Sequence, residues 1–147
     1  MARLPDHVTG KALNEELLRG SNCFGCGLEN PDGLRIRIYR DGGRTDRLIG
    51  IYQPRETAGG FPQIVHGGLQ FTALDCMAGW TMLVLRNPGK MMPLTKSAAT
   101  RYHRPAQLAP DGGELRLSAE VAREAATPRD PILIHTEIHD EIGRAHV

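Results

Sequence analysis

The stretch VHGGLQFTALDCMAGW, from Val65 to Trp80, decides the fold. It contains one charged residue, Asp75, and no other side chain from Leu69 to Leu85 carries a formal charge. The run lacks the alternation of a strand, so it predicts a long helix from His66 to Arg86 that is apolar on nearly every side and therefore buried. A carboxylate inside a protein is costly without partners, so the role of Asp75 needs an explanation.

The flanking sequence predicts an antiparallel sheet around this helix. A short covering helix is expected at residues 11–19, and several segments with strand-like patterns surround the central run. The predicted strands are residues 33–40, 47–54, 95–105, 114–125 and 131–141, and residues 144–147 could begin one more. We therefore predict an α+β fold, in which a curved antiparallel sheet wraps one long central helix.

Length and composition limit the possible functions. The 147 residues suit one domain, with residues 1–20 as an N-terminal covering helix and extension and residues 21–147 as the domain proper. A net charge of +1 and 5% aromatic residues argue against a nucleic-acid partner. The N-terminus has no apolar signal core, and the apolar run is slightly short for a bilayer, so we expect a cytoplasmic protein without a membrane partner.

The spacing of two features on the helix suggests a site shared between two chains. Gly67 and Gly68 lie where the first helical N–H groups have no partner in the helix, so these amides can bind a developing oxyanion. Gly68 and Asp75 are seven residues apart, on one helix face but separated by about 10 Å along the axis. If the two act together, a second copy of the helix running antiparallel across a two-fold axis would bring them into contact.

Simpler interpretations exist for each of these residues. Asp75 can be a satisfied core carboxylate bonded to a threonine or a backbone amide. The two glycines can be a tight entry from loop to helix, and His66 can be a capping or packing residue. The combination of the three features is what favours a functional site.

The central stretch of the chain resembles that of the hot-dog-fold thioesterases of the phenylacetate-pathway (PaaI-like) type. Their central-helix signature is His-Gly-Gly with an acidic residue nine positions after the histidine, matched here by His66, Gly67, Gly68 and Asp75. The stretches CFGCGLENPDGLRI (23–36) and TKSAATRYHRPA (95–106) also look like family segments, and the resemblance covers roughly residues 21–144.

The resemblance implies a hydrolase that cleaves acyl-CoA thioesters at the interface of a homodimer, often within a dimer of dimers. Asp75 would be the general base or a nucleophile, a backbone amide near Gly68 would hold the thioester oxygen, and His66 would shape the turn. Thr95 falls where the family often has a hydroxyl that orients water near the acid. No cofactor or metal is implied.

Two departures from the family pattern concern the substrate and the last strand. Relatives often carry an Asn or Gln before the histidine that binds the thioester carbonyl or water, and Gln63 is the only candidate in this loop. The last strand of the family is expected to be short here. Arg101 and Arg104 could bind the phosphates of CoA, because guanidinium groups suit phosphate, although either can be an ordinary solvated residue.

Cys23 and Cys26 form a Cys-x-x-Cys pair, which could be a metal knuckle, a redox pair or a packed loop. A zinc site usually has four ligands, and only Cys76 in the central helix remains, so we expect no metal.

Two other functions remain open for the whole chain. One is a non-catalytic hot-dog protein that only binds acyl-CoA. The other is a hot-dog hydratase or dehydratase, which would need a histidine to act with the acid.

Overall fold

The computed structural model describes residues 8, 10–86, 92–108, 113–140 and 147. It contains two α-helices, two short helical turns and four strands. In chain order these are α1 (Leu13–Leu17), β1 (Arg37–Arg40), β2 (Arg47–Tyr52), η1 (Glu56–Ala58), α2 (Gly67–Thr81), η2 (Met82–Arg86), β3 (Leu115–Arg123) and β4 (Leu133–His139).

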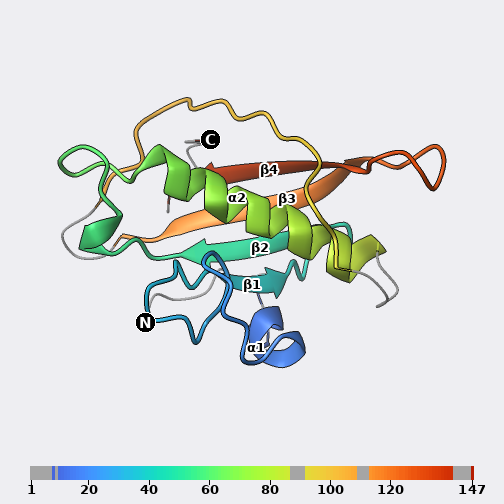
Figure 1. Cartoon of the computed structure of the whole chain (residues 1–147), viewed down its shortest axis with the longest axis horizontal. Helices are drawn as coiled ribbons and strands as arrows, with labels where there is room; N and C mark the ends of the chain where they lie inside the picture. The colour runs from blue at the N-terminus through green and yellow to red at the C-terminus, as the bar shows by residue number, and fades with distance from the viewer. Residues whose placement is uncertain (1–7, 9, 87–91, 109–112, 141–146) are drawn as a thin grey trace.

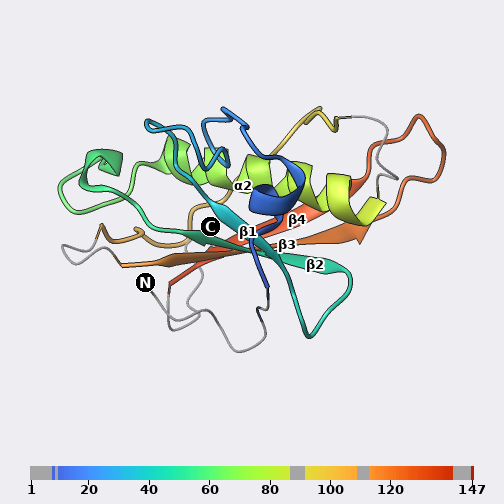
Figure 2. The same ribbon diagram turned by 90° about the horizontal axis from the view of Figure 1, so that it is seen from below.

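The four strands form one antiparallel sheet in the order β1-β2-β3-β4. The predicted hairpin is β1 and β2, with Ile38 opposite Gly50, and Gly50 in turn lies opposite Leu117 of β3. α2 lies along one face of this sheet, so that helix and sheet form two layers (Figures 1 and 2). The predicted α+β architecture with a long central helix is therefore confirmed.

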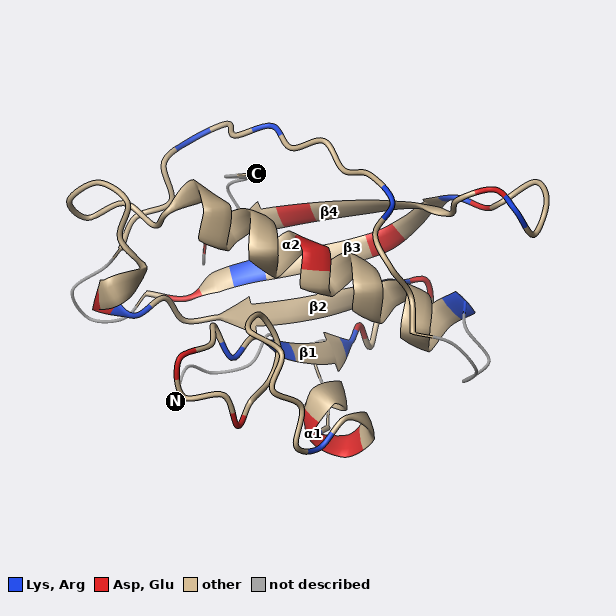
Figure 3. Ribbon diagram, in the orientation of Figure 1, with Lys and Arg blue, Asp and Glu red and all other residues tan. Residues whose placement is uncertain are grey.

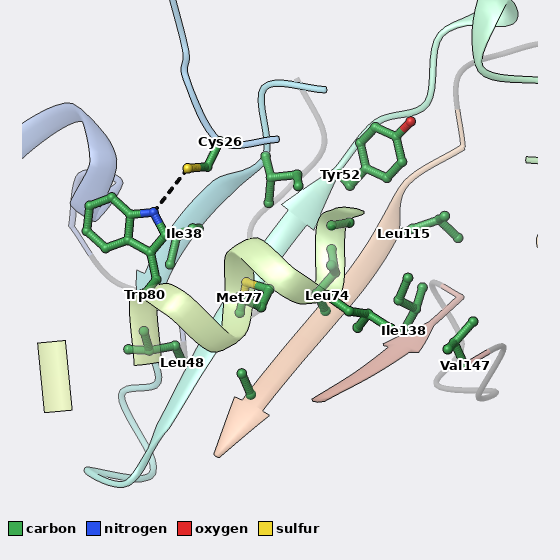
Figure 4. Close-up of a cluster of buried hydrophobic side chains, with 14 of the residues drawn as sticks. Cys26, Ile38, Leu48, Tyr52, Leu74, Met77, Trp80, Leu115, Ile138 and Val147 are labelled. Carbon is green, nitrogen blue, oxygen red and sulfur yellow. Dashed lines mark hydrogen bonds between the residues drawn. The ribbon is translucent and has the colours of Figure 1, made fainter. Parts of the chain in front are cut away.

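The core lies between α2 and the sheet (Figure 4). The side chains of Ala73 and Met77 are fully buried there, and Trp80 is nearly so. Met77 packs directly over β2 at Gly50, where a Cβ atom would lie only 2.6 Å from the Met77 sulfur. The absence of a side chain at this position lets the helix approach the strand.

The outer face of α2 differs from the prediction of a helix buried on nearly every side. Gly68, Phe71 and Asp75 are exposed on the single chain, so the expectation that Asp75 is buried is wrong for one copy. One sheet can cover only one face of a straight helix, and an apolar composition alone does not reveal which face stays open.

The helix also meets the length and composition of a membrane span. Gly67–Arg86 is 20 residues long with a mean hydropathy of 1.2. The central helix of a folded domain has the same properties, and here the inner face of α2 packs on the sheet.

The predicted strand at residues 95–105 is wrong. This segment forms no strand and runs alongside α2, in the yellow-orange part of the chain in Figure 1. Nearly all of its residues are exposed. The segment has few apolar side chains to bury against the core, and two hydrogen bonds to α2, from Thr95 and Tyr102, hold it instead.

The N-terminal covering helix is confirmed, although it is shorter than predicted. Asn14 of α1 is buried and donates hydrogen bonds to the backbone oxygens of Cys26 at 2.8 Å and Ile36 at 2.7 Å. These bonds fasten α1 to the chain that leads into β1. Of the expected last strand, residues 144–146 lie outside the described residues, while Val147 exchanges backbone hydrogen bonds with Ile138 of β4.

Candidate active site

His66 occupies the N-cap position of α2 and gives this helix its start. Its Nδ1 atom accepts a hydrogen bond of 2.9 Å from the N–H of Gly68, and its backbone oxygen accepts from Leu69 and Gln70. Such a cap satisfies one of the amides that a helix terminus leaves without a partner. The capping interpretation of His66 is therefore correct for this structure.

The His66 cap determines which backbone N–H at the start of α2 remains available to a ligand. Because the Gly68 N–H already donates to His66, the expected oxyanion donor at Gly68 is engaged unless the imidazole moves. Among the described residues, the Gly67 N–H has no hydrogen-bond acceptor. The backbone oxygen of Gly67 accepts a 2.8 Å hydrogen bond from the Tyr102 hydroxyl. Gly67 is thus the better-placed donor of the two glycines.

Thr95 lies beside Asp75, near the acid where the family resemblance would place a hydroxyl. The Thr95 hydroxyl donates a hydrogen bond of 2.5 Å to Oδ1 of Asp75, a length typical of a bond to a charged acceptor. Figure 3 shows the acidic position in the middle of α2, with the 92–108 segment passing beside the helix. Oδ2 has no hydrogen-bond partner within the described part of the chain, so it can accept one from a water molecule.

A single chain does not unite the two halves of the predicted site. Gly68 and Asp75 share the exposed side of α2, but helix geometry separates them by about 10 Å along the axis. Phe71, which is 36% exposed, lies between them on that side. The carboxylate of one chain therefore cannot act on a group bound at the helix N-terminus of the same chain.

The candidate substrate-binding residues are all exposed. Gln63 is exposed in a left-handed conformation with φ of 63°, and its backbone oxygen accepts a 2.7 Å bond from Leu108. It lines an open cleft of about 1030 Å³, whose lining includes neither Asp75 nor Thr95. Arg101 and Arg104 are exposed in the segment around Tyr102, close in sequence to the contact with the helix N-terminus.

Two features of the site region were missed at the sequence level. Tyr102 is not among the predicted site residues, although it lies only two positions before the Arg104-Pro105 pair. The sulfur of Cys76 lies within 4.8 Å of those of Cys23 and Cys26, so the three thiols can together offer ligands to a metal. The prediction of no metal rests on the number of cysteines, because zinc usually has four protein ligands in a structural site and this chain has three cysteines.

The comparisons with known proteins bear on the fold. No protein-family model matches the chain, and no curated protein matches its sequence. A thioesterase superfamily protein of known crystal structure matches 82% of this chain with a TM-score of 0.66 and 23% identity, and this chain spans 53% of that one.

Two further solved structures agree with this match. A hypothetical thioesterase from Streptococcus pneumoniae, solved with coenzyme A, has 17% identity and a TM-score of 0.61, with coverage of 76% of this chain and 77% of that one. The Escherichia coli PaaI protein from the phenylacetic acid degradation operon has 18% identity and a TM-score of 0.61, with coverage of 77% and 73%. The chain therefore has the hot-dog fold that these solved structures share.

Proposed function

We propose that this protein is an acyl-CoA thioesterase that hydrolyses a thioester to a carboxylic acid and free CoA. The observation that carries the proposal is the Asp75–Thr95 pair, on the same exposed side of α2 as the glycine-rich helix N-terminus. Hydrolysis of a thioester needs a polarised carbonyl and an activated water, and these two features can provide one each.

In the proposed reaction, the N–H of Gly67 binds the thioester oxygen and stabilises the charge that develops on it. Asp75 accepts a proton from the attacking water, and the proton then passes to the departing CoA sulfur. The alternative is attack by the Asp75 carboxylate itself, followed by hydrolysis of the resulting anhydride. The Thr95 hydroxyl fixes the orientation of the carboxylate in either case.

The proposed assembly is a two-fold dimer, alone or within a dimer of dimers. Two α2 helices that pack antiparallel by their exposed sides would place Asp75 of one chain beside Gly67 of the other. The apolar side chain of Phe71 would be buried in this contact, and the small residues Gly68 and Gly79 would allow the helices to approach closely.

The proposed substrate class rests on the fold match and on local charge. The related pneumococcal structure contains coenzyme A. Arg101 and Arg104 are exposed near the helix N-terminus and would bind the phosphates of the CoA moiety, since guanidinium groups form paired hydrogen bonds to phosphate. We also propose a cytoplasmic location, where acyl-CoA substrates occur.

A panel of aromatic, short-chain and medium-chain acyl-CoAs tests the proposal, with thiol release followed by a colorimetric reagent. Asp75→Asn should lower kcat by about 10²–10⁴-fold, the range typical of a general base, and should leave the dimer intact in light scattering. Asp32→Asn makes the same chemical change at an exposed residue that is not part of the proposed site and should leave kcat unchanged. Full turnover by Asp75→Asn would remove Asp75 from the mechanism.

A second candidate function is binding of acyl-CoA without hydrolysis. Two observations favour it: the Gly68 amide already donates to His66, and Gln63 lines a cleft whose lining does not include Asp75. A wild-type protein that binds CoA in calorimetry but releases no thiol from any member of the panel would support this alternative.

A further inference from the structure

The three cysteines of the chain meet at one place although they come from two separate segments. Cys23 and Cys26 lie in the loop that follows α1, and Cys76 lies in α2. All three Sγ atoms are within 4.8 Å of one another, and those of Cys23 and Cys76 are 3.7 Å apart. All three cysteines are free thiols.

These separations suit three thiolates around one metal ion. Zinc binds thiolate sulfur at about 2.3 Å, so two sulfurs on a tetrahedral or trigonal ion are about 3.8–4.0 Å apart. The 3.7 Å between Cys23 and Cys76 is close to that value. A disulfide would use only two of the three sulfurs and would not account for the position of the third sulfur beside them.

The loop is shaped to bring its cysteines against the helix. A Cβ atom at Gly25 would lie 2.3 Å from the sulfur of Cys76, and one at Gly27 would lie 2.4 Å from the backbone oxygen of Ser21. The N–H of Gly27 also closes a turn onto the backbone oxygen of Cys23 at 2.9 Å. Only glycine allows both of these close approaches.

One of the thiols already has a hydrogen-bond donor of the kind that supports a metal ligand. The indole N–H of Trp80 donates to Sγ of Cys26 at 3.2 Å, and both side chains are buried (Figure 4). Groups that hydrogen-bond a metal ligand orient it and tune its charge. Cys23 is exposed, so the cluster has one side open to solvent.

We propose that Cys23, Cys26 and Cys76 bind a thiophilic metal ion, Zn²⁺, with a water molecule as the fourth ligand on the side of Cys23. On binding, each thiol releases its proton to solvent and its sulfur coordinates the ion. The ion would fasten the loop to α2 beside Asp75, and it takes no part in the proposed hydrolysis.

Binding can be measured on the wild-type protein without any activity assay. The protein is reduced, stripped of metal, and titrated with Co²⁺ and then Zn²⁺ in the absence of oxygen. We expect about one ion per chain, a sulfur-to-cobalt charge-transfer band that Zn²⁺ abolishes, and loss of reactivity of the three thiols toward a thiol reagent. Absence of the band, or full thiol reactivity at saturating Zn²⁺, would overturn the proposal.

Variants then assign the ligands. Cys76→Ser should weaken Zn²⁺ binding by more than the roughly 10–100-fold expected for Trp80→Phe, which removes the donor to Cys26 but no ligand. Phe24→Leu changes an exposed residue between the two loop cysteines and should leave the affinity unchanged. Equal Zn²⁺ affinity in Cys76→Ser and wild type would refute the site, and so would a Cys23–Cys76 disulfide in place of bound metal. If Cys76→Ser does not fold, the cobalt spectrum of the wild type decides.

Discussion

Removal of the Thr95 hydroxyl offers a test of how the carboxylate is positioned. Thr95→Val keeps the branched shape of the side chain and deletes only the group that donates to Oδ1 of Asp75 at 2.5 Å. If the carboxylate must be oriented to activate water, kcat should fall while KM stays nearly constant, because the lost interaction acts in the transition state.

The expected size of the effect follows from the bond and its surroundings. Hydrogen bonds to charged groups contribute about 1.5–3 kcal/mol, and a short O–H to carboxylate bond is of the strong kind. Thr95 is exposed, so solvent competes for the carboxylate and the lower end of the range applies. About 1.5 kcal/mol corresponds to roughly a 10-fold decrease in kcat.

Two further measurements distinguish a role of Thr95 in orienting Asp75 from a purely structural role: the free energy of unfolding and the effect of the substitution in an Asp75→Asn background. Thr95 lies on the surface outside the helices and strands, so Thr95→Val should change the free energy of unfolding by less than about 0.5 kcal/mol. In an Asp75→Asn background, Thr95→Val should cause no further loss of kcat, because both changes act on the same carboxylate. Thr100→Val makes the same substitution in the same segment and serves as the control.

Two results would refute this reasoning. One is an unchanged kcat in Thr95→Val, and the other is an additional 10-fold loss when the change is made in Asp75→Asn. The second result would mean that Thr95 acts independently of Asp75.

Two further predictions concern the stability of the fold. Met77→Ala should lower the free energy of unfolding by about 2–5 kcal/mol, because the fully buried Met77 side chain would leave a cavity between α2 and β2. A loss of less than about 1 kcal/mol in urea denaturation would contradict the packing. Burial opposes ionisation of Glu137, but hydrogen bonds from His135 and His139 outweigh it and hold the pKa of this carboxyl below its ordinary value of 4.5. Glu137→Gln should therefore have a lower free energy of unfolding than wild type at neutral pH, and this difference should shrink as the pH falls through the lowered pKa. Urea denaturation of both proteins from neutral pH to about pH 3 measures the difference, and a difference that stays constant over this range would contradict the prediction.

The central helix and the hairpin could be predicted because their patterns are local. The run after His66-Gly67-Gly68, in which Asp75 is the one charged residue, has no strand period, and the alternation in residues 33–40 and 47–54 has no helix period. The structure places α2 at Gly67–Thr81 with its continuation to Arg86, and the hairpin as β1 and β2.

The failures concern contacts between distant segments. The strand expected at residues 95–105 is absent because that segment binds the side of α2, which its own sequence does not indicate. The exposure of Asp75 depends on which face of α2 the sheet covers. The approach of Cys76 to the Cys23–Cys26 loop joins residues about fifty positions apart, and no local pattern carries that information.

Three consecutive residues of α2 face three different surroundings: Asp75 the solvent, Cys76 the other cysteines and Met77 the core. Inserting one residue into the helix before them would rotate each side chain by about 100° around the helix axis, away from its present contacts. A change in the length of this helix before Asp75 would therefore disturb all three contacts at once, whereas a change in a loop would disturb at most the contacts of that loop.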